Sequence, residues 1–378
     1  MSVSHACVDV YQGSVAALVP FFVAERAYSY AAAAGIVLAA SLLSSIVQPL
    51  FGVLTDRWAM PWLLPVSTVA GGAGVALAGV TSGYALTLVV VAVSGIGVAA
   101  YHPEAARVAR AAAGRSHQAM SWFSLGGSLG FATAPLLVGA VVATGGLGAS
   151  PLLVVPALAG AALCVAALRS ARIASAATPQ GAAPVGRDDR RSFLLLSGAV
   201  VCRSIVFVGL SAFVSLLVVQ RMGGGEATGT AALFVLYLGG AVGTVAGGSL
   251  AVRFGRLPVT RWSYALTVVA VAGVVLVPGP LLFVFVAAAS AGLYVPFSLH
   301  ITLGQDYLPL HVGTASGVTL GLTVSIGGLA SPAIGALADA SSLPVALSPL
   351  ILLPAVGLLF LRPLREPVAA ELVAQRRV

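Results

Sequence analysis

The sequence predicts an all-α polytopic membrane protein with twelve transmembrane helices in two pseudo-symmetric six-helix bundles. Apolar residues make up 59% of the 378 positions and charged residues only 8%, whereas soluble domains carry about 25% charged residues. The chain also divides into twelve apolar runs of spanning length, and two segments of its first half recur in the second half. A soluble fold of this composition would expose large apolar patches, so lipid is the expected solvent.

A lipid core about 30 Å thick is crossed by around 20 mostly apolar helical residues. Gly, Pro and Arg separate such runs along the chain. The expected spans are 6–24, 29–53, 62–80, 84–106, 118–143, 149–168, 192–219, 229–251, 261–277, 280–303, 313–338 and 343–361. The sequence therefore predicts a first bundle at 1–170, a polar linker at 171–191, a second bundle at 192–361 and a tail at 362–378.

The 19 basic residues, all arginine, are distributed unevenly between the ends of these spans. If both termini are cytoplasmic, 16 arginines fall in cytoplasmic segments, Arg26 and Arg221 fall outside, and Arg203 lies within a span. Because basic residues are concentrated in cytoplasmic loops, we expect a multi-pass protein of the inner (cytoplasmic) membrane with both termini inside. The arginines form no basic stripe, so we expect no nucleic-acid partner.

An internal repeat relates the two halves. The run GVLTDRW at 52–58 is followed at an offset of 196 by GSLAVRF at 248–254, and GFATAPLLVG at 130–139 is followed at an offset of 197 by GGLASPAIG at 327–335. Repeats of this kind are common in transporter folds. The Gly- and Pro-rich runs suit both close helix packing and rocking between halves.

Polar side chains form one stripe on the first span. His5, Asp9 and Gln12 recur at helical spacing, so they face protein or water instead of lipid. Titratable groups inside a span are costly and are functional candidates by default. We expect Asp9 to carry a proton with His5 beside it, and Gln12 to contact substrate. A structural acid bonded to His5 or to a neighbouring span is the alternative interpretation.

The fourth span ends in a second polar group around Pro103. His102 and Glu104 are candidates for proton coupling, and Tyr101 for substrate binding. The two titratable residues lie about 200° apart on an ideal helix, so only a proline kink would bring them to one face. A local ion pair between Glu104 and Arg107 is the equally weighted alternative.

The second half offers fewer titratable groups. Arg203, halfway along the seventh span, could hold an anionic substrate or pair with another helix, and His300, near the repeat equivalent of His102, could contact substrate or serve as a structural hydrogen-bonding group. Asp56 and Arg57, with Arg107, are expected to form a cytoplasmic gate, although a solvated loop ion pair is the alternative for Asp56 and Arg57. The cysteines show no metal-binding spacing, and we expect no metal or cofactor.

The motif G-x-L-x-D-R at Gly52–Arg57 resembles the signature loop of the major facilitator superfamily, and its second copy has Val252 in place of the acid. The runs TDRWAMPW at 55–62 and YHPEAARVAR at 101–110 resemble the fosmidomycin resistance branch, as do HACVDVYQG, GGSLG and QDYLP elsewhere in the chain. The resemblance implies the major facilitator fold, a cavity lined by spans one, four, seven and ten, and proton-driven efflux of small anionic or amphipathic compounds.

The leading hypothesis is therefore a monomeric, proton-coupled exporter that works by alternating access. A proton-coupled importer of a small metabolite remains open, because the sequence does not decide direction. An integral membrane enzyme is disfavoured, because the only adjacent acids, Asp188 and Asp189, lie in the polar linker and no Walker-type nucleotide loop is present.

Overall fold

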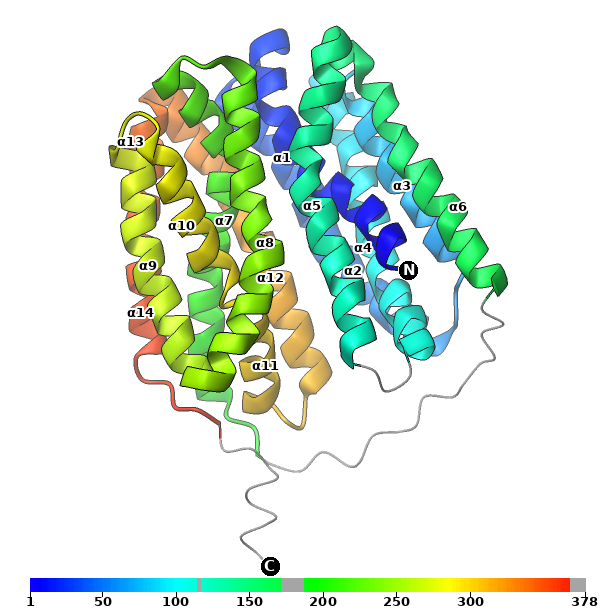
Figure 1. Ribbon diagram of the computed structural model, residues 1–378, viewed down its shortest axis with the longest axis vertical. Coiled ribbons are helices and arrows are strands. Elements are labelled where there is room, and N and C mark those ends of the chain that lie inside the picture. The colour runs from blue at the N-terminus through cyan, green and yellow to red at the C-terminus, as the bar shows by residue number, and fades with distance from the viewer. Residues whose placement is uncertain (114–116, 171–186, 368–378) are drawn as a thin grey trace, which may run out of the picture.

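The structure is a computed structural model that describes residues 1–113, 117–170 and 187–367. Side chains are not described at 45–46, 56–57, 110–113, 117–121, 170, 244, 312–313, 316–317, 320 and 323–325. Helices account for nearly all of the described chain and no strand occurs in it. Two helical bundles lie side by side, the first running from blue to green on the right of Figure 1 and the second from green to red on the left.

The first half contains six spans. They are α1 (Ser2–Arg26), α2 (Tyr30–Arg57), α3 (Leu63–Ala78), α4 (Tyr84–Ala113), α5 (His117–Gly145) and α6 (Val155–Ser170), the last preceded by a 3₁₀ helix at Gly146–Val154. Several helices extend beyond the predicted runs where polar residues continue the helix past the lipid core. α4, for example, continues past the expected end at 106 to Ala113. α3, in contrast, is shorter than the run predicted at 62–80.

The second half repeats this order with two interrupted spans. Its helices are α7 (Arg190–Met222), α8 (Gly225–Phe254), α9 (Arg256–Leu276), α10 (Leu281–Tyr294), α11 (Phe297–Tyr307), α12 (Val312–Ala340), α13 (Leu343–Leu347), a 3₁₀ helix at Ser348–Ile351, and α14 (Leu352–Leu361). The tenth span is thus divided between α10 and α11 at Pro296, and the twelfth between α13 and α14.

Length and composition alone single out nine apolar segments within the described residues as candidate spans. One of them, Trp122–Arg169, covers both α5 and α6, and the shorter apolar helices include Leu63–Ala78 and Ile326–Ala340. Dividing Trp122–Arg169 into α5 and α6 and adding the two shorter helices gives the twelve expected spans. The chain is therefore a multi-pass membrane protein with the predicted fold class.

Capping residues fix several helix ends. The Ser29 hydroxyl accepts a hydrogen bond from the Ala32 N–H at the start of α2, and Asp189 accepts one from the Ser192 N–H at the start of α7. This backbone donor also lowers the pKa of Asp189, because it stabilises the carboxylate. α7 ends at Met222, and the residue that caps it is Gly223, whose φ of 63° is favourable only for glycine and a few polar residues.

The two ends of the molecule differ in charge. We call the end at which α6 finishes and α7 begins the linker end, and the opposite end the hairpin end (Figure 1). Arg169, Arg187 and Arg253 are among the arginines at the linker end, whereas Arg26 and Arg221 lie at the hairpin end. Arg26, at the end of α1, donates to the Gly79 carbonyl after α3, and Arg221, at the end of α7, donates to the Val277 carbonyl after α9. The two arginines therefore occupy equivalent places in the two halves.

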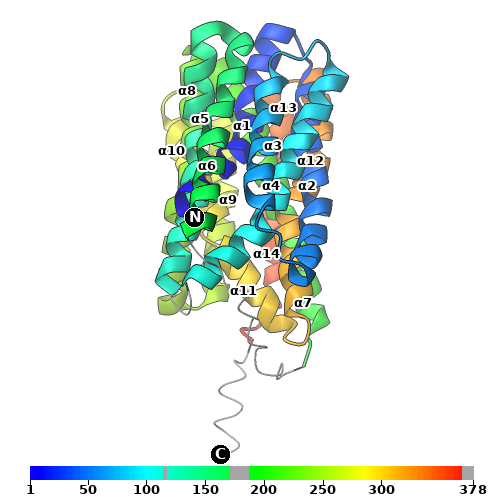
Figure 2. The same ribbon diagram turned by 90° about the vertical axis from the view of Figure 1, so that its right-hand side faces the viewer.

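The halves pack through α2 against α12 and α5 against α8 (Figure 2). Glycines allow close approach: a methyl group on Gly335 would lie 2.6 Å from the Tyr30 carbonyl oxygen. At the hairpin end the Asp339 carboxylate accepts hydrogen bonds from the N–H groups of Tyr30 and Ala31, at 2.8 and 2.9 Å. The C-terminus of α12 thus caps the N-terminus of α2 across the two halves.

The repeat is visible in the packing inside each half. In the first half, a methyl group on Gly130 of α5 would lie 2.0 Å from the Ala6 carbonyl oxygen of α1. In the second half, one on Gly327 of α12 would lie 2.4 Å from the Ser204 carbonyl oxygen of α7. Equivalent glycines therefore let equivalent helices touch, as small residues do in membrane bundles.

Candidate functional site

Three titratable side chains from α1 and α4 meet in the first half. His5 Nε2 lies 3.3 Å from Asp9 Oδ2, and His102 Nε2 lies 3.0 Å from Asp9 Oδ1. We call these three residues the Asp9 cluster. The side chain of Asp9 is 12% exposed and that of His102 is 24% exposed, so the cluster is nearly buried but reaches open space on the His102 side.

Backbone carbonyls fix the protonation pattern of both imidazoles. The Nδ1 atom of His5 lies 2.8 Å from the Phe123 carbonyl oxygen, and that of His102 lies 2.7 Å from the Val98 carbonyl oxygen. A carbonyl only accepts, so both Nδ1 atoms carry hydrogen. A neutral ring then presents the lone pair of Nε2 to the carboxylate, and that contact is favourable only when a proton lies between them.

The Asp9 cluster is therefore built to hold at least one proton beyond those on the two Nδ1 atoms. Without it, one carboxylate and two imidazole lone pairs face each other at close range. The contacts are not aligned as regular hydrogen bonds, since Asp9 Oδ1 and His5 Nε2 have no partner of that geometry in the part of the chain that the structure describes. One nitrogen or oxygen atom from each of the three side chains also lies within 4.8 Å of the other two, a spacing that could accommodate a metal ion.

A central cavity of about 80 Å³ lies one helical turn from this cluster. Its walls come from α1, α2, α4 and α5 of the first half and from α7 and α8 of the second. They combine the aromatic residues Tyr11, Phe131, Phe207 and Tyr237 with the polar residues Gln12, Ser41, Ser44, Ser94 and Ser211. Gln12 thus lines the cavity, on the same helix as Asp9.

The volume of the cavity is smaller than that of a typical binding site. Sites for drug-sized ligands usually measure about 300–1,000 Å³. The volume of about 80 Å³ here is enough for a few water molecules. Phe131 and Tyr237 restrict it from opposite halves, with ring centroids 4.2 Å apart. Binding of a substrate requires these rings to separate.

Arg203 is buried in the second half with its side chain turned towards α10. The residue is 3% exposed, and its Nε atom donates to the Leu293 carbonyl oxygen at 2.5 Å. Its guanidinium carbon lies 6.0 Å from the centre of the Phe207 ring, which lines the cavity. No carboxylate forms an ion pair with Arg203 in the described part of the chain.

His300 is also buried, and its Nε2 atom lies 3.4 Å from the Tyr264 hydroxyl. The side chain of His300 therefore extends from α11 towards α9 and does not line the central cavity. Tyr101 is fully buried as well, with its ring 6.1 Å from that of His5. Neither residue lines the cavity as described, so neither contacts a substrate held there without a change in packing.

Glu104 does not join the Asp9 cluster. Its side chain is fully buried and forms a two-pronged pair with Arg107, at 2.9 Å from Oε2 to Nε and 2.5 Å from Oε1 to Nη2. The helix continues through Pro103 without turning Glu104 to the face of His102. The geometry thus matches the alternative interpretation from the sequence, a local ion pair. The side chains of the two other gate candidates, Asp56 and Arg57, lie outside the described part.

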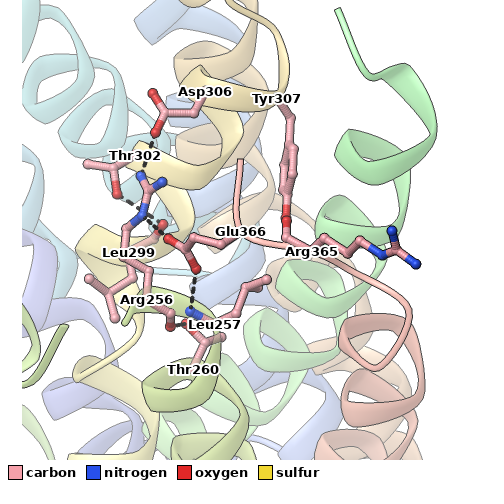
Figure 3. Close-up of polar contacts among 9 residues, drawn as sticks. All are labelled: Arg256, Leu257, Thr260, Leu299, Thr302, Asp306, Tyr307, Arg365 and Glu366. Carbon is pink, nitrogen blue, oxygen red and sulfur yellow. Dashed lines mark hydrogen bonds and ion pairs between the residues drawn. The ribbon is translucent and has the colours of Figure 1, made fainter. Parts of the chain in front are cut away.

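A further polar cluster holds the linker end of the second half together (Figure 3). Arg256 at the start of α9 pairs with Asp306 of α11 and Glu366 of the tail, each at 2.6 Å. Glu366 also accepts a hydrogen bond from the Leu257 N–H, and the Tyr307 hydroxyl donates to the Arg365 carbonyl. These contacts join α9, α11 and the residues after α14.

Comparison with known proteins agrees with this geometry. Residues 1–332 match the Major Facilitator Superfamily. The chain belongs to that superfamily. Its members move small molecules across membranes, so this major facilitator protein is a membrane transporter.

Two relatives resemble the transporter over almost its whole length. The fosmidomycin resistance protein of Escherichia coli (strain K12) is 28% identical over 95% of this chain and 90% of its own. The uncharacterized MFS-type transporter YfnC of Bacillus subtilis (strain 168) is 29% identical over 96% of this chain and 91% of its own.

Solved structures show the same fold at low sequence identity. A bacterial homologue of the human lysosomal transporter Spinster, inward-facing and occupied, has a TM-score of 0.79 at 14% identity, covering 96% of this chain and 94% of its own. A mutant of the nucleoside transporter NupG has a TM-score of 0.79 at 10% identity, covering 96% and 99%.

Two further residues of this major facilitator protein, Asp339 and Phe207, were not among the candidates predicted from the sequence. Asp339 follows the predicted span 313–338 and was given no role, although an acid at the end of an apolar run is a candidate helix cap. Phe207 was not considered because an aromatic residue in a span is normally packing. The sequence offsets of 196 and 197 do not identify Phe207. The packing does, because Ser204 takes the place of Ala6 at an offset of 198, and the same offset makes Phe207 the equivalent of Asp9.

Proposed function

We propose that this protein is a proton-coupled exporter of small drug-like or anionic compounds in the bacterial inner membrane, working by alternating access. The observation that carries the proposal is the Asp9 cluster. It is a nearly buried group of one carboxylate and two imidazoles, built around a shared proton and one turn from a cavity lined by both halves.

Proton binding and helix packing are linked in this cluster. A proton shared between Asp9 and His102 joins α1 to α4, because the two residues belong to different helices. Loss of the proton leaves acceptors facing one another and favours separation of these helices. A transporter can use such a change to couple proton release to a change in the cavity.

The direction and the class of substrate are proposed from different observations. Export of a drug-like compound is supported by the similarity to a protein named for fosmidomycin resistance. An anionic permeant is supported by Arg203, a buried cation with no carboxylate partner in the described part. The ring of Phe207 lies between the Arg203 guanidinium and the cavity. Gln12 and the serines of the wall offer neutral hydrogen bonds to the same compound.

The test is transport in proteoliposomes that contain the purified protein and radiolabelled fosmidomycin as the probe. With one proton exchanged per molecule, a gradient of one pH unit supports about tenfold accumulation. In Asp9→Asn, accumulation should fall to the level seen without a gradient, while exchange between equal internal and external concentrations continues.

Glu226→Gln is the matched control, because it removes an exposed acid at the hairpin end and should leave the gradient dependence unchanged. Full gradient dependence in Asp9→Asn would show that the coupling proton binds elsewhere. Bound transition metal in the purified protein, lost in His102→Ala, would instead favour a metal at this cluster.

An importer of a small metabolite is the second candidate, since the same geometry serves either direction. A strain lacking the gene discriminates between the two. Loss of an exporter makes cells more sensitive to the exported compound, whereas loss of an importer makes them resistant or limits growth on the nutrient.

A further inference from the structure

The repeat relates the Asp9 cluster to an incomplete copy in the second half. In the packing Ser204 of α7 takes the place of Ala6 of α1, an offset of 198, so His5 corresponds to Arg203 and Asp9 to Phe207. At the same offset His102 corresponds to His300. The first half therefore holds two nitrogen bases with a carboxylate between them. The second half holds a cation and an imidazole, and an aromatic ring stands at the position of the acid.

The missing acid leaves hydrogen-bond donors unused. Among the described residues, neither the buried Arg203 Nη1 nor the buried hydroxyl of Tyr294 on α10 has a hydrogen-bond partner. A buried cation without a counter-charge is strongly unfavourable. Within the described residues nothing compensates Arg203 except carbonyl and aromatic contacts, so the site favours an anion from outside the chain.

The break in the tenth span strengthens this preference. Pro296 has no N–H, so it interrupts the helix between α10 and α11. Arg203 binds the Leu293 carbonyl just before the break, and the ring of Phe297 at the start of α11 lies 5.3 Å from the guanidinium. The N-terminus of α11 therefore adds its partial positive charge close to Arg203.

Phe207 separates this group from the central cavity. Its ring lines the cavity, lies 6.0 Å from the Arg203 guanidinium carbon and packs edge-on against Tyr294, with ring centroids 5.4 Å apart. A second crevice, lined by Arg203, Tyr264 and Leu293, has no room for a water molecule. Of these two spaces the central cavity is the one that can admit an anion, and the Phe207 ring must move before the anion reaches Arg203.

We propose that Arg203 and Tyr294 form an anion subsite for the acidic group of the permeant, a carboxylate or phosphonate, with Phe207 as its aromatic cover. The bound anion takes the place in the second half that the Asp9 carboxylate has in the first. The inference deepens the proposed function, because it names the chemical group that the transporter recognises and the residues that select it.

The experiment measures equilibrium binding to the purified protein in detergent, without a proton gradient. The probes are phenylphosphonate and its neutral dimethyl ester, which share a ring and differ in charge. We expect the anion to bind and to raise the melting temperature in a concentration-dependent way, and the ester to have little effect. Binding should persist in Asp9→Asn, which separates this test from that of proton coupling.

Three variants test the two donors and the aromatic cover. Arg203→Gln should weaken phenylphosphonate binding about tenfold to a hundredfold, the usual effect of losing a charged hydrogen bond. Tyr294→Phe should weaken it about twofold to tenfold, and Phe207→Ala should speed association because the cover is gone. Arg221→Gln is the matched control, since Arg221 lies on the same helix with its guanidinium on the carbonyls of Val275 and Val277.

Two outcomes would overturn the subsite. One is equal binding of the anion and its ester to the unaltered protein, and the other is an unchanged preference for the anion in both Arg203→Gln and Tyr294→Phe. Stabilisation by chloride alone, lost in Arg203→Gln and not displaced by phenylphosphonate, would assign the site to a resident ion and overturn its role in substrate recognition. Arg203→Lys and Tyr294→Phe keep the test valid if Arg203→Gln does not fold.

Discussion

At the scale of single residues, Glu104 shows how a buried carboxylate can serve the helix that carries it. Its side chain is fully buried, and both oxygens contact Arg107, whose side chain is 30% exposed. The pair lies near the linker end of α4, directly after the residues that hold the Asp9 cluster. It therefore stabilises the segment that positions His102.

Glu104→Gln should lower the free energy of unfolding by about 2 kcal/mol. Breaking a buried pair costs about 3–5 kcal/mol, and we reduce this value because Arg107 is partly in contact with solvent. Thermal or chemical unfolding in detergent measures the effect. The Glu104→Gln, Arg107→Gln double variant should recover part of the loss, and an equal or larger loss in the double variant would exclude the pair as its cause.

The candidate site was only partly predictable at this scale. The spacing of His5 and Asp9 places both on one face of a helix, and their contact follows from it. That His102 rather than Glu104 meets Asp9 depends on the rotation of α4 against α1, which the packing of both helices decides. Phe207 could not be recognised as a cover, because its role depends on Arg203 and Tyr294 from different helices.

At the scale of helices, α1 and α5 are held together by a glycine pair. Methyl groups on Gly126 and Gly130 would lie 2.2 and 2.0 Å from the carbonyl oxygens of Ser2 and Ala6. The atoms in the way belong to the backbone of α1, so no side-chain rotation relieves the contact. This spacing of two small residues four apart is typical of close helix packing in membranes.

Gly130→Ala should destabilise the protein by about 1–3 kcal/mol, the usual cost of overpacking, and should disturb the α1 segment that carries Asp9. Gly248→Ala is the matched control. Gly248 lies in α8 with open space around it, so alanine should be neutral or stabilising there. Melting temperatures of the two variants in the same detergent test the difference, and similar values would show that α1 can move away freely.

Helix existence was more predictable than helix shape. The apolar runs indicated all twelve spans, because their length is set by the lipid core. The division of the tenth span at Pro296 was not anticipated, since a proline within a span gives either a kink or a break depending on the neighbouring helices. The Arg203 side chain, which binds the carbonyl of Leu293, is one such neighbour.

At the scale of the whole molecule, each half is tied internally and the halves meet mainly along two helix pairs, α2 with α12 and α5 with α8. The cluster of Arg256, Asp306 and Glu366 fixes the linker end of the second half (Figure 3). The Asp339 cap on α2 joins the halves at the hairpin end. Such an arrangement suits rocking of two bodies, in which the cap opens while the internal ties remain.

The arginine asymmetry predicts that the linker end is cytoplasmic. After replacement of Cys7, Cys164 and Cys202, a single cysteine at Glu226 should react with a membrane-impermeant maleimide in intact cells. One at Arg187 should react only after the membrane is permeabilised. Both positions are exposed, so accessibility to the reagent reports the side of the membrane. The reverse pattern would invert the topology.

The Asp339 cap has a genetic consequence. Its two donors are backbone N–H groups, so any residue except proline at positions 30 and 31 supplies them equally well. A gate built from two side chains can be broken, or repaired by a compensating change, from either partner. Apart from proline at positions 30 and 31, loss-of-closure alleles should gather at position 339, and no second-site change in the side chains of α2 should restore them.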